Sequence, residues 1–268
     1  MKYTILSVGC LLFMGLSWQV NAYDEENLKK LLETKKCEKC ALNGVDLTNA
    51  KLARANLAGT NLSGANLSLT GLIEANLTGA DLTKANLRGT NLEKADLRGL
   101  NLSEANLYWT NLKGVNLVQA NLTKAYVEGA QLTRANLSGA NLKGVSLWKT
   151  NLKGVDLEGA NLEEANLTGV NLTRANLWDA NLTGANLEGL SLEGANLAKA
   201  NLEGAILTNV NMTKANLEGA NLKGTILTNA NLTDAVLALT RNFNTADITG
   251  ANFCRTIMPD GSRNTSRC

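Results

Sequence analysis

Residues 55–79 read ANLAGTNLSGANLSLTGLIEANLTG, five successive copies of a five-residue unit with leucine at its centre. The period holds without a slip from Leu42 to Leu237, where 38 of 40 central positions are leucine and the others are Val127 and Met212. On an α-helix five residues advance about 500°, so these leucines would spread around the whole surface. On a flat strand an odd period sends alternate leucines to opposite faces. The period therefore predicts a coil that turns a corner once per unit.

The residues around the central leucine indicate which side chains face inward. Positions two apart on an extended segment share a face, and the position two before the leucine is Ala in 25 of the 40 units. The residue between is Asn in 26 units, and the two residues after the leucine are mostly Thr, Ser, Glu, Lys and Gly, which suit a turn. We therefore expect an all-β solenoid with Leu and Ala inside and Asn outside.

One echo in the sequence indicates the number of units per turn. The segment GAILTN at residues 204–209 returns as GTILTN at 224–229, so an unusual outward isoleucine recurs after four units. A duplication of twenty residues would give the same echo. The A(N/D)LXX run is similar to the pentapeptide-repeat proteins over about 200 of the 268 residues. The resemblance implies a right-handed quadrilateral β-helix with four units per turn, here of about ten to eleven turns.

The first 22 residues are typical of a secretory signal peptide. Lys2 precedes an apolar run from Ile5 to Trp18, and residues 20–22 form a small-residue cleavage site. A membrane anchor is the alternative, but the run is short for a membrane span. We expect an exported protein of the periplasm, the thylakoid lumen or the cell exterior, with no membrane span in the mature chain.

Residues 23–40 are expected to form a helical cap with a CxxC motif. In the helical segment 24–34, Leu28, Leu31 and Leu32 share one face, with acidic residues at the start and lysines near the end. Such a helix would cover the open edge of the first turn. A helix that binds a partner is the alternative.

Cys37 and Cys40 form the CxxC motif that follows this helix. The chain has no histidine and no second CxxC, so a zinc site is not expected. Cys40 stands two before Leu42 in an inward position, and a buried sulfur is a poor nucleophile for disulfide exchange. We favour a structural pair, as a disulfide or as two buried thiols, over redox chemistry. The lead-in LLETKKCEKC resembles that of exported family members, which supports a cap.

The repeat changes register near its C-terminal end. After Leu237 the next central residue is Phe243, six residues on, and the spacing then returns to five. We expect one inserted residue near residues 238–242 and a β-helix that spans 41–258.

The tail, residues 259–268, begins with Pro-Asp-Gly, which is typical of a turn. Cys254 lies in an outward register, so the tail can fold back and bring Cys268 to it. We expect a disulfide between Cys254 and Cys268.

Sorting the outward residues by position modulo twenty gives each face a character. The face centred on Leu52 and Leu72 carries eight basic and four acidic residues, whereas the next face is acidic. The face centred on Leu47 and Leu67 carries the candidate interaction patch: Leu69, Tyr108, Trp109, Tyr126, Trp148, Ile206 and Ile226. Aromatic side chains clustered on a polar surface are typical of an interaction site. Alternatively, these rings fold down over the edges of the coil.

The sequence does not indicate an enzyme. It has no histidine, no phosphate-binding glycine loop and no convergent set of acids or nucleophiles, and a coil packed with leucine leaves no cavity. We expect no catalytic residue, no cofactor and no metal. A net charge of +2 gives no global attraction to nucleic acid.

We therefore expect a structural or protein-interaction scaffold, a monomer or weak dimer with an unidentified protein partner. The resemblance implies one alternative, a DNA-mimic inhibitor of a type II topoisomerase. Family members with that activity are strongly acidic cytoplasmic dimers, whereas this chain is nearly neutral and carries a leader.

Overall fold

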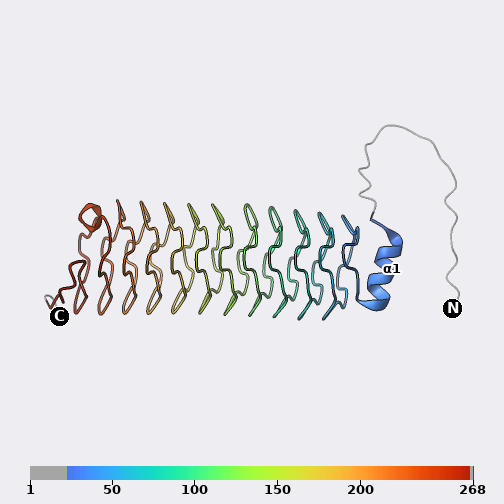
Figure 1. Cartoon of the computed structure of the whole chain (residues 1–268), viewed down its shortest axis with the longest axis horizontal. Helices are drawn as coiled ribbons and strands as arrows, with labels where there is room; N and C mark the ends of the chain where they lie inside the picture. The colour runs from blue at the N-terminus through green and yellow to red at the C-terminus, as the bar shows by residue number, and fades with distance from the viewer. Residues whose placement is uncertain (1–22, 266–267) are drawn as a thin grey trace, which may run out of the picture.

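The structure, a computed structural model, describes residues 23–265 and Cys268. The chain winds into a long rod of stacked turns, with helix α1 (Glu25–Thr34) across the N-terminal end (Figure 1). A short 3₁₀ helix, η1 (Phe243–Thr245), lies near the other end. Between them the turns pair through single β-bridges. The predicted signal peptide, residues 1–22, lies outside the described residues.

Between residues 36 and 241, nearly every unit of the coil pairs in parallel with the unit twenty residues away. Asn56 bridges to Asn76, and Asn76 bridges to Asp96. The amide of Leu57 donates to the Asn76 carbonyl at 2.8 Å, and the Asn76 amide donates back to the Ala55 carbonyl at 2.9 Å. Because each unit has five residues, this offset places four units in every turn.

The same offset accounts for the echo in the sequence. Ile206 and Ile226 are bridge partners on neighbouring turns. The prediction of four units per turn is therefore confirmed, and the modulo-twenty sorting places residues on common faces.

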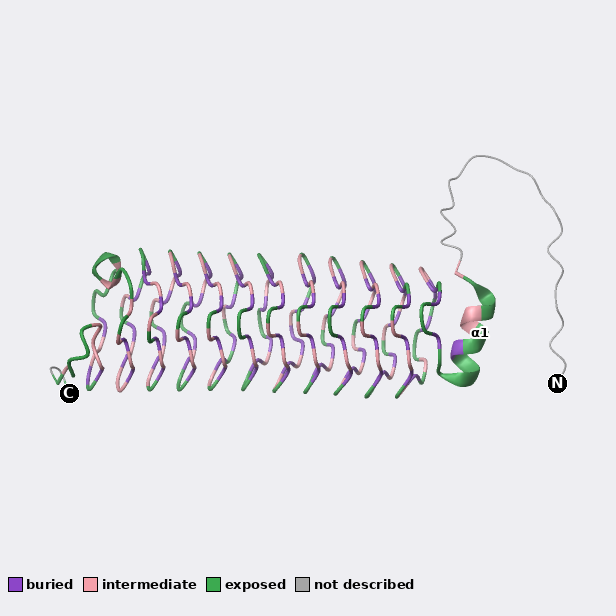
Figure 2. Ribbon diagram, in the orientation of Figure 1, coloured by how far each residue is buried: buried purple, intermediate pink, exposed green. Residues whose placement is uncertain are grey.

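The central side chains fill the axis of the rod. Every central residue from Leu42 to Leu237 is at most 3% exposed, and Figure 2 shows that buried residues recur on every turn of the rod. Full burial of one leucine contributes roughly 1.5–3 kcal/mol before chain entropy is subtracted. The column of leucines is therefore the main source of stability, and its predicted inward orientation is confirmed.

The position two before the leucine lies at a tight corner of the coil. The amide of Ala55 donates to the Leu52 carbonyl at 3.0 Å and closes this corner. Where threonine replaces alanine, its buried hydroxyl needs an acceptor. The Thr110 hydroxyl donates to the Leu87 carbonyl on the previous turn at 2.8 Å. Small side chains are therefore required here, and threonine is tolerated because a carbonyl is within reach.

The asparagines do more than face solvent. Asn86 donates from its amide nitrogen to Oδ1 of Asn66, one turn earlier, at 3.1 Å. Its own Oδ1 accepts from the amide of Arg88 at 3.2 Å and stabilises the corner that follows. These half-buried side chains therefore connect neighbouring turns and shape each corner.

Helix α1 packs one face against the first turn. Asp24 caps it, because its Oδ1 accepts from the amides of Glu26 at 2.8 Å and Asn27 at 3.1 Å. Leu31 is fully buried and Leu28 packs partly against the core, but Leu32 is 55% exposed. The prediction that Leu32 shares the buried face is wrong, because it lies about 100° around the helix from Leu31.

The coil begins earlier than the predicted boundary at residue 41. Lys36 already bridges to Asn56, and the Cys37 amide donates to the Asn56 carbonyl at 2.8 Å. Cys37 occupies the central position of an additional first unit, five residues before Leu42. A disulfide of 2.01 Å joins it to Cys40, and both cysteines are buried. The CxxC motif thus belongs to the first units of the coil, because a cysteine side chain can take the place of a leucine.

The bridges place the inserted residue later than predicted. Asn221 pairs with Arg241 at the usual offset of twenty, but Ile226 pairs with Asp247 at an offset of 21. The extra residue therefore lies within 242–246, in the segment that contains η1, at the C-terminal end of the predicted segment or just beyond it. The segment bulges locally and the ladder then resumes.

The tail folds back on the last turn. Ile257 pairs with Arg263 in an antiparallel bridge. Cys254 and Cys268 are joined by a disulfide of 2.13 Å, and Cys254 is only 6% exposed. The outward-facing Cys254 is thus covered by the tail.

Candidate interaction surfaces

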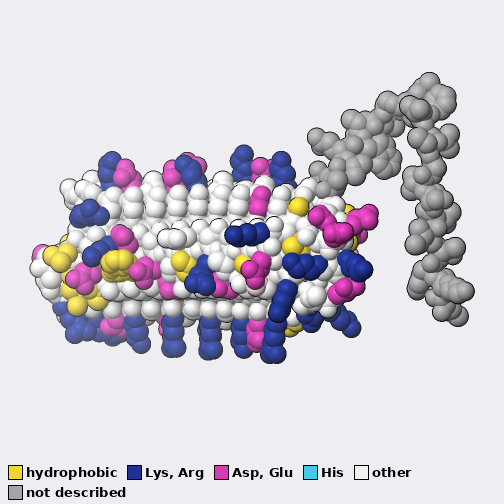
Figure 3. Space-filling view, turned by 45° about the vertical axis from the view of Figure 1, so that its right-hand side comes forward, with side chains coloured by type: hydrophobic (Ala, Val, Ile, Leu, Met, Phe, Trp, Pro, Cys, Tyr) yellow, Lys and Arg dark blue, Asp and Glu magenta, His cyan; other side chains and the backbone are white. Residues whose placement is uncertain are grey.

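The surface of the rod carries lines of charge parallel to its axis. In Figure 3, Lys and Arg side chains are aligned along one edge, whereas most of the remaining surface is neither charged nor hydrophobic. Several cations pair with an acid one turn away, as in Arg54–Glu74 at 2.8 Å and Lys143–Glu163 at 2.9 Å. Such exposed pairs contribute little to stability, because water and salt screen the attraction.

The four aromatic residues of the predicted patch lie on one face, on three consecutive turns. The rings of Tyr108 and Tyr126 are stacked, with centroids 6.0 Å apart and planes at 26°. Trp109 and Trp148 are 63% and 46% exposed. We call these four residues the aromatic patch. The alternative, in which the rings fold down over the coil, describes only part of the arrangement.

That part concerns Trp109, which lies flat over the next turn. It follows the leucine by two residues, where the backbone has a φ of 58°. A Cβ added to Gly129 would lie 2.7–2.9 Å from three atoms of the indole ring. The ring therefore packs on the bare backbone of Gly129 and leaves its other face to solvent.

Charged groups lie at the border of the aromatic patch. The ammonium group of Lys149 lies 4.0 Å from the ring centroid of Trp148, a cation–π contact. Burial raises the pKa of Tyr108, and the negative charge of Glu128 raises it further. One carboxylate oxygen of Glu128, Oε2, is buried and has no hydrogen-bond partner among the described residues. The patch thus combines ring faces with one cation and one partly desolvated acid.

The structure separates the aliphatic members of the predicted patch from the rings. Leu69 is 62% exposed and lies on the same face two turns before Trp109. Ile206 and Ile226 pair with each other three or more turns beyond Trp148. At roughly 4.8 Å per turn, separations of two or more turns keep Leu69 and the two isoleucines out of contact with the rings.

Sequence reasoning missed Glu128, Gly129 and Lys149. One signal for Gly129 was present: at twenty-residue spacing, the positions of Leu69, Trp109 and Lys149 alternate with glycines. Leu69 and Trp109 each lean over the glycine of the next turn, Gly89 and Gly129, where a Cβ would clash with them.

A metal site and a membrane-spanning helix are both absent from the described residues. Within residues 23–265, no cluster of three or more His, Cys, Asp or Glu side chains could hold a metal ion. Of the helices in this described part, none has the length and apolarity needed to cross a membrane.

Comparison with known proteins gives consistent matches to one family. A family model described as pentapeptide repeats matches in eight copies, over residues 36–68, 72–99, 101–139, 140–179, 150–189, 175–213, 185–224 and 215–258. Among solved structures, the chain is similar to HetL, a pentapeptide repeat protein involved in heterocyst differentiation regulation in the cyanobacterium Nostoc. The two are 32% identical over 91% of this chain and 100% of HetL, with a TM-score of 0.56.

Two more distant structures also match. A pentapeptide repeat protein from the thylakoid lumen of Arabidopsis thaliana is 30% identical over 52% of this chain and 66% of its own, with a TM-score of 0.23. The plasmid-mediated fluoroquinolone resistance protein QnrB1 is 17% identical over 78% of this chain and 91% of its own, with a TM-score of 0.30. Among curated proteins, nothing matches the chain.

Proposed function

Because the chain belongs to the pentapeptide-repeat family, we propose that it is a non-catalytic scaffold whose rod presents the aromatic patch to a protein partner. The observation that carries this proposal is the cluster of Tyr108, Trp109, Tyr126 and Trp148 on an otherwise polar surface. Tryptophan and tyrosine dominate the binding energy of protein interfaces, because they bury a large area at a low cost in side-chain entropy.

The way the coil holds the aromatic rings favours a role in binding a partner. A partner that binds the aromatic patch gains most when the rings are already held in place. Trp109 is held on the backbone of Gly129, and Tyr108 and Tyr126 are held against each other. The patch is thus pre-organised on a rigid support.

We infer two finer features of the rod from the family. The coil is right-handed, as in the other pentapeptide-repeat proteins. It has about eleven turns, because the bridges run from Lys36 to Ile257 at twenty residues per turn.

We also propose that the protein is exported. Residues 1–22 have the composition of a signal peptide. Two disulfides, Cys37–Cys40 and Cys254–Cys268, fit an oxidising compartment such as the periplasm, the thylakoid lumen or the cell exterior.

Proximity labelling in the native cell tests the scaffold. We compare the wild-type protein with the double variant Trp109→Ala/Trp148→Ala and with the control Trp178→Ala, whose ring lies on another face near Lys199. Because both patch rings are exposed, the double variant is expected to keep its fold and its circular dichroism spectrum. It should lose at least one labelled protein that the control retains. Identical labelled proteins for all three chains would refute the proposal.

The topoisomerase alternative has its own test. A DNA mimic must present dense negative charge, whereas this chain has 26 basic and 24 acidic residues. We expect no inhibition in a gyrase supercoiling assay. Inhibition at micromolar protein would favour the alternative.

A further inference from the structure

A second surface lies on the face next to the aromatic patch and is strongly basic. Five cations stand on five consecutive turns, one per turn: Lys94, Lys113, Arg134, Lys153 and Arg174. Their turns are joined by an unbroken series of bridges through residues 91, 111, 131, 151 and 171. At roughly 4.8 Å per turn, the row extends for about 20 Å along the axis.

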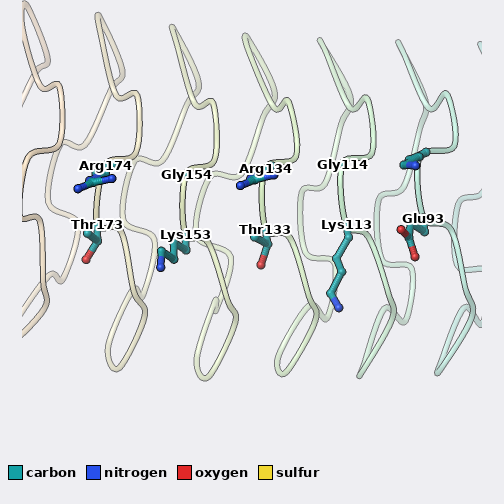
Figure 4. A pocket seen from close by; sticks show the side chains of 10 residues that line it. Glu93, Lys113, Gly114, Thr133, Arg134, Lys153, Gly154, Thr173 and Arg174 are labelled. Carbon is teal, nitrogen blue, oxygen red and sulfur yellow. The ribbon is translucent and has the colours of Figure 1, made fainter.

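These cations line a shallow furrow of about 600 Å³. We call it the basic furrow. Figure 4 shows Arg134 and Arg174 along one side, and Lys113 and Lys153 along the other. The two sides alternate because the cation is the second corner residue on one turn and the first corner residue on the next.

Glycines keep the furrow open. Gly114 and Gly154 occupy the second corner position on the turns that carry Lys113 and Lys153. A Cβ on Gly114 would lie 3.7 Å from Cγ of Lys94, and one on Gly154 would lie 3.9 Å from Cγ of Arg134. The aliphatic stems of Lys94 and Arg134 therefore lie beside these glycines, along the furrow.

The positive charge of the furrow is only partly neutralised, because five cations face one acid. Among the ion pairs of the described residues, none includes any of the five cations, although Arg54, earlier in the same row, pairs with Glu74. Glu93 is the single acid that lines the furrow, and it accepts a hydrogen bond from the Asn111 side chain at 3.4 Å. Cations on neighbouring turns lie within about one Debye length of each other at physiological salt, so adjacent cations act on a ligand together.

We propose that the basic furrow binds a linear acidic polysaccharide, a β-1,4-linked polyuronate laid along the axis of the rod. In an extended chain of this linkage, successive carboxylates project to opposite sides. The cations on the two sides of the furrow meet such alternating carboxylates in turn. Hydroxyl groups of the sugars find partners in Thr133 and Thr173, which also line the furrow.

Two observations favour a polysaccharide over a nucleic acid. Proteins that bind single strands stack the bases on aromatic side chains, and the lining contains only Glu, Lys, Arg, Thr and Gly. In addition, the two disulfides fit an oxidising compartment rather than the cytosol or nucleus, where nucleic acids are concentrated.

The experiment measures binding of a mannuronate octamer, a β-1,4-linked polyuronate, by isothermal titration calorimetry. The proteins are the full chain, the furrow variant Arg134→Gln/Lys153→Gln and the control Lys124→Gln/Lys199→Gln, which removes equal charge from two other faces. The furrow variant should bind on the order of tenfold more weakly, about 1.4 kcal/mol. The control should stay within about twofold of wild type, which is less than 0.5 kcal/mol.

Three outcomes would overturn the proposal. If the wild-type chain does not bind the octamer at low salt, a polyuronate is not the ligand. If the control and the furrow variant are weakened equally, the octamer does not bind at the basic furrow, because net charge alone would then explain the effect. A single-stranded thymidine octamer that binds the furrow as tightly as the octamer of mannuronate would assign the site to nucleic acid. Weaker binding of the thymidine octamer supports the polysaccharide.

Discussion

Replacing Gly129 with alanine should destabilise the rod through Trp109, on the neighbouring turn. The new Cβ would lie 2.7 Å from Cε3 of the indole and 2.9 Å from two further ring atoms. Ordinary contacts between carbon atoms are about 3.5–4.0 Å. The ring must therefore move by roughly 1 Å or leave the backbone of Gly129.

A matched substitution isolates this effect. Gly144 has a φ of 65°, similar to the 73° of Gly129, but a Cβ added there meets nothing within 4 Å. Gly144→Ala should cost only the strain of a left-handed alanine, about 1 kcal/mol. Gly129→Ala should cost this strain and about 2 kcal/mol more for displacement of the ring. The expected total is about 3 kcal/mol.

Urea unfolding followed by circular dichroism measures both variants, and Trp109→Ala completes a double-mutant cycle. In the Trp109→Ala background, Gly129→Ala should cost about 1 kcal/mol, the same as Gly144→Ala. The coupling energy between the two positions is then about 2 kcal/mol. Equal losses for Gly129→Ala and Gly144→Ala in the wild-type background would refute the packing of Trp109 on Gly129.

Three further predictions test the core, the tail and the surface charges. Leu147→Ala should lower the free energy of unfolding by about 3 kcal/mol, because it leaves a cavity. Asn141→Ala loses only polar contacts and should lower it by about 1 kcal/mol. Equal losses in urea unfolding would contradict the inward orientation of Leu147 and the outward orientation of Asn141. Cys268→Ser should cost about 3 kcal/mol by opening a loop of roughly 15 residues, and mass spectrometry of the non-reduced wild-type protein should find no free thiol at this position. The hydrogen bond from Arg255 lowers the pKa of Asp234 below 3.8. The ionised Asp234 therefore stabilises the fold at neutral pH, and this stabilisation is lost as the pH falls through the lowered pKa. Asp234→Asn should therefore lose less stability than wild type between about pH 5 and pH 2, and an equal loss would contradict this role.

The regular part of the fold could be predicted because one local pattern repeats without interruption. An odd period of five excludes a helix and a flat strand, and the isoleucine echo indicates four units per turn. The errors lie where the pattern ends. Cys37 was not recognised as a central residue because it is not a leucine, although it stands five residues before Leu42. The place of the inserted residue was predicted only approximately, because several backbone paths connect Leu237 to Phe243 and the choice depends on contacts with the previous turn.

The candidate sites were only partly predictable, for a related reason. The position modulo twenty places a residue on a face but does not give the direction of its side chain. Sequence reasoning therefore grouped Ile206 with Trp148, which lie three turns apart, and missed Gly129, which supports Trp109. The alternation of cations between the two sides of the basic furrow likewise depends on which corner residue carries the charge.

The constant offset between paired units also has a consequence for how the protein folds and grows. Each backbone hydrogen bond between turns closes a loop of about twenty residues, so the entropy of loop closure is similar at every turn. The mean sequence separation of contacts does not increase with the length of the rod, and folding can propagate from one turn to the next. A block of twenty residues can therefore be duplicated without a longer search for its partners. The near-identical segments at 204–209 and 224–229, which lie side by side on adjacent turns, have the form that such a duplication would leave.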